Sequence, residues 1–286
     1  MRLLLTGASG FTGIHLAKAA REVGYTVIEL AGDLCDKVSV VKQIAQNKPT
    51  HAIHLAGISQ VTGKDELDYY KTNLLGSLNV LNGLAELDLV PQKVILASSA
   101  NVYGNNPHSP IREIEPPSPI SHYAMSKLAM EYLSKPFLDR LPIVIARPFN
   151  YTGVGHAEHF VIPKIIAHFS LRAKTIELGN TDVYREYNDV RDVCQMYLML
   201  LQKGNPSETY NLATGREHSL KEVIAMLEKL SGHPMQVNVN PAFLRVNEID
   251  RLCGDPSRLI GSIGEQQYRH LEETLEWMLQ SQMMNN

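Results

Sequence analysis

The chain has 286 residues, of which 44% are hydrophobic and 20% are charged, and its formal net charge is −3. This length allows one large domain, or a nucleotide-binding domain with a smaller domain attached. The nearly balanced charge excludes the basic surface expected of a nucleic-acid-binding protein and gives no sign of an anionic membrane partner.

The cysteines and the amino-terminal segment indicate a cytoplasmic protein. Cys35, Cys194 and Cys253 are far apart, odd in number and without metal-ligand spacing, so we interpret them as structural thiols and expect no metal site. Met1 leads directly into an apolar strand and a glycine turn, without the basic or long apolar segment of an export signal or a membrane anchor. We therefore expect a soluble protein of the cytoplasm.

Short apolar strands alternate with amphipathic helices over the first 150 residues, as βαβ units around a parallel sheet do. A proline-rich loop is expected at residues 107–119, before the helix predicted over 123–133. After residue 150 the alternation of strands and helices becomes less regular. The fold class predicted is α/β. Strands are predicted at residues 2–5, 26–30, 51–55, 94–97 and 142–146, and helices at 14–23, 38–46, 74–87, 123–133, 161–169, 220–230 and 271–278.

A glycine-rich turn, TGASGFTG, follows the first predicted strand and opens the first predicted helix. Gly7, Gly10 and Gly13 allow the backbone to turn tightly and to approach a diphosphate, and the helix presents its first amide groups to that diphosphate. A loop that merely needs positive φ angles is the alternative. The flanking strand and helix favour a dinucleotide site.

The end of the second predicted strand leaves the cofactor open between NAD and NADP. In NAD enzymes an acidic residue commonly binds the adenosine ribose here, and in NADP enzymes an arginine accommodates the 2′-phosphate. In this chain the place holds Ala31, and neither an acid nor an arginine is well placed. We expect Asp33 and the following Leu34 to lie near the adenine instead.

A tyrosine and a lysine four residues apart indicate acid–base chemistry. Tyr123 and Lys127 lie on one face of the helix predicted over 123–133. A phenol with a pKa of about 10 is a poor acid–base group at neutral pH, and a nearby ammonium is expected to lower that pKa. Tyr123 could then exchange a proton with an oxygen of the substrate. Ser99, just past the end of the strand at 94–97, is placed to hold that same oxygen.

Structural interpretations compete with these functional ones. An isolated pair of this spacing is usually an amphipathic tyrosine and a solvated lysine on an exposed helix. Here the glycine turn, the serine after a strand and the tyrosine helix occur together and in one order, which favours the functional interpretation. His54 and His122 are interpreted as structural, because a lone histidine near a strand end or in a loop is seldom an acid–base group.

Together these motifs resemble the extended short-chain dehydrogenase/reductase family over nearly the whole chain. Similar segments are TGASGFTG at 6–13, HLAG at 54–57, TNLLGSLNVL at 72–81, SSANVYG at 98–104, YAMSK at 123–127 and ARPFN at 146–150. The resemblance implies a Rossmann-like, doubly wound NAD(P)-binding domain over residues 1–150, to which later segments can return, and a smaller substrate domain mainly over 151–286. It implies a catalytic set of Ser99, Tyr123 and Lys127, and a cofactor site of Gly7, Gly10, Phe11, Thr12, Gly13, Asp33, Leu34, Leu55, Ala56, Gly57, Asn73, Tyr123 and Lys127.

The residues after the active hydroxyl distinguish branches of this family. Sugar-nucleotide 4,6-dehydratases carry acidic residues there, because eliminating water needs an acid and a base beyond the tyrosine. This chain has Ala100 and Asn101, which disfavours a dehydratase and leaves epimerases and reductases. Later segments, among them FNYTG at 149–153 and HFVIP at 159–163, are similar to those of GDP-4-keto-6-deoxymannose reductases.

A substrate site is implied by the same resemblance. A guanidinium can pair bidentately with a diphosphate and a carboxylate can accept hydrogen bonds from a ribose, whereas a surface ion pair is the alternative for each arginine. The chain departs from its relatives at Glu186, where aspartate is usual, at Ala31, and at Gly57, where alanine is common. The substrate-binding residues implied are Asn101, Asn150, Arg185, Arg245 and Glu248.

The sequence therefore predicts an NADPH- or NADH-dependent reductase of a nucleotide-linked 4-keto-6-deoxyhexose. GDP-4-keto-6-deoxy-D-mannose is the expected substrate and GDP-D-rhamnose the expected product, with a role in surface polysaccharide synthesis. A dTDP-4-keto-6-deoxyhexose reductase, a nucleotide-sugar 4-epimerase and an inactive dinucleotide-sensing protein stay open as alternatives. The family commonly dimerises through two helices, and the apolar character of residues 74–87 and 123–133 suggests a homodimer here.

Overall fold

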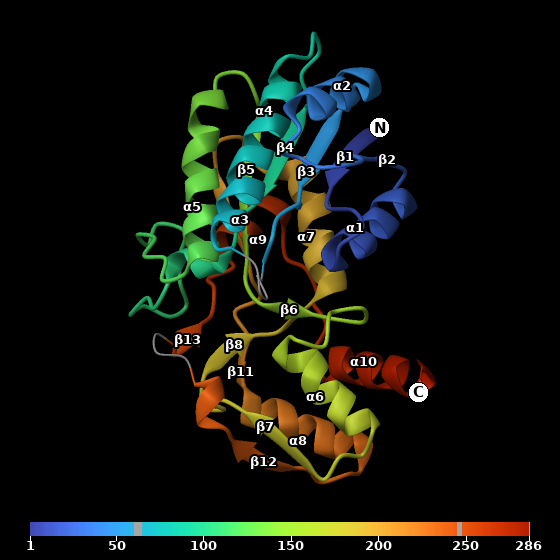
Figure 1. Ribbon diagram of the computed structural model, residues 1–286, viewed down its shortest axis with the longest axis vertical. Coiled ribbons are helices and arrows are strands. Elements are labelled where there is room, and N and C mark those ends of the chain that lie inside the picture. The colour runs from blue at the N-terminus through green and yellow to red at the C-terminus, as the bar shows by residue number, and fades with distance from the viewer. Residues whose placement is uncertain (60–64, 245–247, 286) are drawn as a thin grey trace.

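The computed structural model describes residues 1–59, 65–244 and 248–285 (Figure 1). The strands in these ranges are β1 Arg2–Thr6, β2 Thr26–Glu29, β3 His51–His54, β4 Lys93–Ala97, β5 Ile143–Pro148, β6 Tyr151–Thr152, β7 Thr175–Leu178, β8 Tyr184–Glu186, β9 Asn188–Asp189, β10 Thr209–Leu212, β11 Glu217–Ser219, β12 Gln236–Val239 and β13 Arg251–Leu252. The α-helices are α1 Phe11–Glu22, α2 Lys37–Asn47, α3 Leu67–Tyr70, α4 Ser77–Ala85, α5 His122–Ser134, α6 Val161–Ser170, α7 Val190–Lys203, α8 Leu220–Ser231, α9 Ser257–Ile263 and α10 Leu271–Asn285. A π-helical turn, η1 Lys71–Gly76, and three 3-10 turns, η2 Ala100–Tyr103, η3 Lys135–Phe137 and η4 Pro241–Phe243, complete them.

Six parallel strands form the central sheet in the order β10-β5-β4-β3-β1-β2. The register places Leu4 of β1 beside Ala52 of β3 on one side and Ile28 of β2 on the other. The direction of winding reverses between β1 and β3, and in such sheets a crevice forms at the carboxyl ends of the strands next to this reversal. The predicted Rossmann-like, doubly wound parallel sheet is confirmed.

Each strand of this sheet contributes side chains to two cores, because neighbouring residues of a strand point to opposite faces. Leu3 and Leu5 of β1 pack with α1, α7 and α9, whereas Leu4 packs with α2, α4 and the β4–β5 residues of the other face. All three leucines are fully buried. Burial on both faces explains why these strands are continuous apolar runs without alternation.

The sequence did not predict α7 and β10, which return the chain to this sheet after residue 150. β10 pairs in parallel with β5, and α7 packs beside α1. The helix predicted over 74–87 corresponds to α4 and the last three residues of η1, a π-helical turn that separates α4 from the short helix α3. Single π-turns of this kind are frequent at functional sites.

A second layer of structure lies below the sheet in Figure 1 and consists of α6, α8 and α10 with short strands. The three helices share an apolar core that includes Ile165, Leu227 and Leu275. β7 pairs in parallel with β12, and β8 lies between β11 and β13. Helix α8 is capped at its N-terminus by a capping box of Ser219 and Glu222, in which the two side chains accept hydrogen bonds from otherwise unpaired amide groups.

None of the helices in the three described ranges has the length and apolarity needed to cross a membrane.

Candidate active site

The glycine turn between β1 and α1 has the geometry of a diphosphate cradle. Gly7 adopts a φ of +71°, and a methyl group added to it would lie 2.8 Å from the Ala56 nitrogen. A methyl group on Gly13 would lie only 2.0 Å from the Gly7 oxygen. Helix α1 begins after Gly10 without a side-chain cap, so its first amide groups are directed to the turn. These residues fit a dinucleotide diphosphate, which needs close backbone approach and unpaired amide donors.

Phe11 and Thr12, the first residues of α1, connect the glycine turn to the segment after β5. The Phe11 ring stacks on His156 with centroids 4.4 Å apart and lies 6.0 Å from the ring of Tyr151. The Thr12 hydroxyl is 2.7 Å from the Tyr151 hydroxyl. The side chains of both predicted cofactor residues thus pack against the carboxyl-terminal half of the chain.

The adenine side of the predicted site is held by side chains of α2 and α4. The Gln43 side chain accepts a hydrogen bond from the Ala31 nitrogen and donates one to the Ala31 oxygen, each at 2.9 Å. This neutral amide therefore holds the backbone of Ala31, the residue at the expected ribose-binding position. Asp33 accepts from the Cys35 nitrogen at 2.9 Å. The Leu34 oxygen accepts from Asn79 at 2.9 Å. This arrangement presents no carboxylate at Ala31 that would repel a 2′-phosphate.

The segment from Leu55 to Gly57 runs from the glycine turn to the tyrosine helix. The Ala56 nitrogen donates to the Thr6 hydroxyl at 3.1 Å, and Leu55 packs against the core under α1. A methyl group on Gly57 would lie 2.8 Å from Asn73 Oδ1 and 3.1 Å from Lys127 Nζ. The glycine found here in place of a common alanine therefore has a steric reason.

Asn73, in the π-helical turn η1, uses its amide inside the protein. It accepts from the Ile58 nitrogen at 2.7 Å and donates to the Ile58 oxygen at 3.1 Å and to the Ser126 hydroxyl at 2.9 Å. Its side chain is fully buried. Asn73 thereby ties the 55–58 segment to α5, a positioning role that the π-turn makes possible by turning the side chain inward.

Ser99, Tyr123 and Lys127 converge at the carboxyl end of β4. Ser99 caps η2, where its hydroxyl accepts from the Asn101 nitrogen at 3.2 Å, and it also hydrogen-bonds to the Tyr123 hydroxyl. Lys127 is buried and its Nζ donates to the Ala97 oxygen at 2.8 Å. The strand end and one face of α5 therefore bring together the three residues predicted to be catalytic.

The acid–base character of this group differs from the sequence prediction. Burial raises the pKa of Tyr123, and the hydrogen bond from Ser99 only partly offsets that rise. The predicted lowering of the Tyr123 pKa by Lys127 is wrong for this structure, because the ammonium is directed to the Ala97 oxygen. Burial also lowers the pKa of Lys127 to about 8. At neutral pH the site thus holds a protonated phenol and a charged lysine.

The two histidines interpreted as structural have different surroundings. His54 is buried between the Thr6 hydroxyl, 2.7 Å from Nδ1, and the Ser77 hydroxyl, 2.8 Å from Nε2, and burial lowers its pKa to about 3. His122 is exposed, with the Tyr70 hydroxyl 2.9 Å from its Nδ1 and Glu66 2.9 Å from its Nε2. Within the described ranges, neither ring hydrogen-bonds to Tyr123.

The described residues among those predicted to bind substrate lie on several segments of the fold. Asn101 lies beside Ser99, whereas Asn150 is exposed just before β6. Arg185 donates to the backbone oxygens of Tyr184, Ile249 and Asp250, so it supports the segment that follows Glu248.

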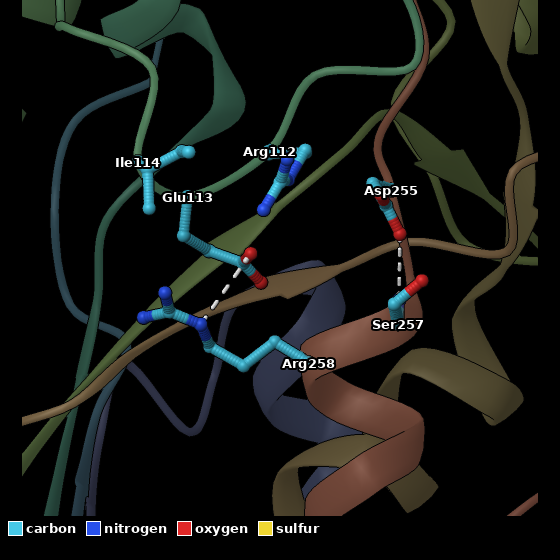
Figure 2. Close-up of a pocket in the computed structure, with 6 residues that line it drawn as sticks. All are labelled: Arg112, Glu113, Ile114, Asp255, Ser257 and Arg258. Atoms are coloured by element: carbon cyan, nitrogen blue, oxygen red, sulfur yellow. Dashed lines mark hydrogen bonds and ion pairs between the residues drawn. The ribbon is translucent and has the colours of Figure 1, made fainter.

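The remaining substrate prediction, Arg245, lies outside the described residues. The Glu248 oxygen accepts from Asn105 at 3.5 Å, which connects the Glu248 segment to the loop after η2. A small pocket of about 90 Å³ lies elsewhere, between the 112–114 loop and the start of α9 (Figure 2). Its lining residues include Arg112, Glu113 and Arg258.

Sequence reasoning missed several residues that the fold brings to the site. Tyr69 of α3 packs against Tyr123, with ring centroids 6.1 Å apart. Tyr151 contacts the glycine turn through Thr12. Glu131 and Arg147 form a buried ion pair at 2.6 Å beneath the catalytic group. Among the described residues, no cluster of three or more histidine, cysteine or acidic side chains could hold a metal ion.

Comparison with known proteins identifies the class. A family model described as GDP-mannose 4,6 dehydratase matches residues 28–278. The chain belongs to this family of extended short-chain dehydrogenases/reductases, which confirms the predicted resemblance. Its relatives are NAD(P)-dependent oxidoreductases and epimerases of nucleotide sugars, so the prediction of an enzyme with a nicotinamide cofactor is confirmed at the level of this class.

Two curated relatives act on GDP-linked deoxysugars by name. The GDP-6-deoxy-D-talose 4-dehydrogenase of Aggregatibacter actinomycetemcomitans is 32% identical over 290 residues, covering 99% of each chain. The GDP-6-deoxy-D-mannose reductase of Pseudomonas aeruginosa is 33% identical over 278 residues, covering 92% of this chain and 91% of that protein. The solved structure of RMD from P. aeruginosa complexed with NADPH has a TM-score of 0.92 at 29% identity, covering 100% of this chain and 99% of that one.

Proposed function

We propose that the protein reduces the C4 ketone of a nucleotide-linked 4-keto-6-deoxyhexose, with GDP-4-keto-6-deoxy-D-mannose as substrate and GDP-D-rhamnose as product. The observation that carries the proposal is the convergence of Ser99, Tyr123 and Lys127 at the carboxyl end of β4, in the same sheet whose glycine turn after β1 fits a dinucleotide. The two curated relatives named for GDP-6-deoxysugars support the substrate class.

The side chains have distinct tasks in this reduction. The bound nicotinamide cofactor supplies the hydride that C4 receives. Tyr123 donates its proton to the oxygen at C4 as negative charge develops there, and its raised pKa keeps the proton available at neutral pH. Ser99 donates a hydrogen bond to the same oxygen. Lys127 places a positive charge at the base of the site and binds the ribose hydroxyls next to the nicotinamide.

A reductase is favoured over a dehydratase by the residues that follow Ser99. Ala100 is buried and carries no acid–base group, and the backbone nitrogen of Asn101 donates to Ser99. Elimination of water from a sugar needs a second acid–base pair near the carbon that loses the hydroxyl. Neither position provides one.

The two halves of the chain divide the binding. Residues 1–150 with α7, α9 and β10 form the NAD(P)-binding domain, because these later elements pack on the central sheet. The other elements after residue 150 form most of the nucleotide-sugar domain. In this proposal the substrate is bound by Asn101, Asn150, Arg185, Arg245 and Glu248. Arg185 also supports the backbone of Ile249 and Asp250.

The protein acts as a homodimer in this proposal, through the face formed by η1 and α5. Leu75 of η1 and Met125 and Tyr132 of α5 are between 42% and 57% exposed, and η1 contacts α5, so these apolar side chains are available to a second copy of the chain. Light scattering after size-exclusion chromatography tests this. A monomer of 31.9 kDa at micromolar concentration would contradict it.

Product analysis tests the substrate and the stereochemistry. GDP- and dTDP-4-keto-6-deoxyhexoses are incubated with the protein and NADPH or NADH, and the products are identified by NMR. The proposal expects a GDP-linked sugar with the manno configuration at C4. A GDP-linked 6-deoxy-D-talose would show hydride delivery to the other face, and turnover of only dTDP sugars would contradict the choice of nucleotide. A change of configuration in an ordinary nucleotide hexose without consumption of cofactor would indicate a 4-epimerase instead.

A further inference from the structure

Glu131 and Arg147 form a buried ion pair next to the segment that carries Ser99. The Glu131 carboxylate accepts from Arg147 Nε at 2.9 Å and from the terminal nitrogen NH2 at 2.6 Å, and both side chains are 8% exposed or less. Removing two charges from water costs several kcal/mol per ion, and well-packed apolar side chains are often as stable as such a pair. Stability alone therefore does not explain why the pair is present at this place.

The carboxylate connects the two elements that carry the catalytic residues. Glu131 lies one helical turn after Lys127, on the same face of α5. The hydroxyl of Ser98, the residue before Ser99, donates to Glu131 Oε1 at 2.5 Å. One buried carboxylate thus contacts the end of β4 and places a negative charge on the Lys127 face of the helix.

Arg147 of β5 extends this connection to β10, the neighbouring edge strand of the sheet. Its NH1 donates to the Tyr103 hydroxyl at 2.9 Å, and that hydroxyl donates to Asn211 Oδ1 at 2.7 Å. The Asn211 nitrogen donates to Glu113 at 2.9 Å, and Glu113 is paired with Arg258 in the pocket of Figure 2. A continuous polar network therefore runs from β10 to the catalytic strand end, with its outer end in that pocket.

We infer that Glu131 is a positioning residue: through Ser98 it holds Ser99 in register with α5, and it places a negative charge on the Lys127 face of that helix, while Arg147 fixes the orientation of the carboxylate. This inference rests on the proposed function, since it assigns the reaction to Ser99, Tyr123 and Lys127. A carboxylate with both oxygens engaged has little freedom to rotate, so it fixes the strand end to the helix.

The charges around Lys127 support this role. Burial lowers the pKa of Lys127 to about 8, and Glu131 opposes that lowering. His54 of β3 also faces Lys127 but stays neutral, because burial lowers its pKa to about 3. Tyr123 on the same helix is protonated, Ala97 of β4 contributes a carbonyl, and η1 contributes the neutral amide of Asn73. Within the part of the chain that the structure describes, Glu131 is thus the anion whose charge acts on Lys127.

The experiment separates positioning from simple stabilisation by three variants. Glu131→Gln removes the charge at constant shape, Ser98→Ala removes only the link to β4, and Ser134→Ala is the control. Ser134 is also buried on α5 but donates to the backbone oxygen of Glu131. Each variant, labelled with ¹³C-lysine, is titrated by NMR to find the midpoint of Lys127, which the Lys127→Arg spectrum assigns. The kcat and the cofactor Kd are measured in parallel.

The inference expects a different result for each variant. In Glu131→Gln the Lys127 midpoint moves to lower pH by roughly one unit, and the basic limb of the pH–rate profile moves with it. In Ser98→Ala the midpoint stays near that of the wild type while kcat falls about tenfold at unchanged cofactor Kd. Ser134→Ala changes neither quantity. Glu131→Asp, which keeps the charge, restores the midpoint.

The same measurements can overturn the inference. If Glu131→Gln and Ser98→Ala lower the melting temperature but leave the Lys127 midpoint and kcat unchanged, the Glu131–Arg147 ion pair has a purely structural role. If Glu131→Gln does not fold, an unchanged kcat in Ser98→Ala overturns it by itself. The NMR titration needs no sugar, so a failure of the proposed reductase reaction is distinguishable from a failure of this inference.

Discussion

Substitution of the glycines around the dinucleotide turn should give a graded loss of cofactor binding. A methyl group on Gly13 would lie 2.0 Å from the Gly7 oxygen, whereas real contacts of this kind are at least 3.0 Å, so the turn must retreat by about 1 Å. A misplacement of that size is expected to weaken NAD(P)H binding about 100-fold, or roughly 2.7 kcal/mol, and to cost about 1–3 kcal/mol of stability. The methyl group of Gly10→Ala would lie 3.3 Å from the same oxygen and should cost less than about tenfold.

Gly261→Ala is the matched control, because no atom lies within 4 Å of the added methyl group in α9. It should bind cofactor like the wild type and gain about 0.5–1 kcal/mol of stability. Binding is measured by calorimetry with NADPH and NADH, and stability by urea unfolding followed through Trp277, the single tryptophan of the chain. Wild-type affinity in Gly13→Ala would refute the assignment of the turn to the diphosphate.

Three further outcomes are expected. His54 has a pKa of 6.5 in the unfolded chain and of about 3 in the folded protein, so its contribution to the free energy of unfolding is complete above about pH 6.5 and falls by about 2 kcal/mol by pH 5. In urea unfolding, this fall should be absent from His54→Gln and kept in His108→Gln, a control at an exposed position. Arg147→Met leaves the Glu131 carboxylate buried without its cation and should cost about 3–5 kcal/mol in the same assay. Tyr151→Phe, which removes the hydroxyl bound to the glycine turn, should raise the cofactor Kd about tenfold while stability changes by about 1 kcal/mol or less.

Each of these has a clear contrary result. An unfolding free energy of His54→Gln that falls with pH as steeply as in the wild type would assign the acid sensitivity to other groups. A cost of less than about 1 kcal/mol for Arg147→Met would mean that water or another cation reaches the carboxylate. An unchanged cofactor Kd in Tyr151→Phe would show that the hydroxyl pair does not shape the glycine turn.

Local patterns were sufficient to predict most of the first half of the fold. The strand at Arg2–Thr6, the glycine turn and the helix of Tyr123 each depend on residues close together in sequence. Spacing of three or four residues shows which side chains share a helix face, and a glycine-rich turn after a strand restricts the backbone strongly. The structure places these elements within a few residues of the predicted bounds.

Contacts between distant segments could not be predicted in the same way. Glu131 and Arg147 are 16 residues apart, and Tyr103 and Asn211 are 108 apart, so no periodicity connects them. The strand β10 is only four residues long and is recognised as part of the sheet only by its pairing with β5. The π-turn η1 at Asn73 contacts α5, which is distant in sequence, and a regular helical pattern does not reveal such a contact.

Charge states were the least predictable part of the site. The spacing of Tyr123 and Lys127 shows that both lie on one helix face, but it does not show where the lysine Nζ points. In the structure Nζ reaches the Ala97 oxygen, and burial dominates the pKa of both groups. The residue types of an active site can thus be predicted before their titration behaviour, which depends on burial.

The central claim is tested most directly by following NADPH and NADH oxidation when purified protein is given GDP-4-keto-6-deoxy-D-mannose. Tyr123→Phe removes only the reacting hydroxyl, and Tyr132→Phe is the control, because it removes a hydroxyl from the same helix and keeps the apolar ring of the proposed dimer face. The account predicts one cofactor oxidised for each sugar reduced, a loss of at least about 100-fold in kcat for Tyr123→Phe and no change for Tyr132→Phe. Substrate-dependent oxidation that persists in Tyr123→Phe, or its complete absence in the wild type, would contradict the account.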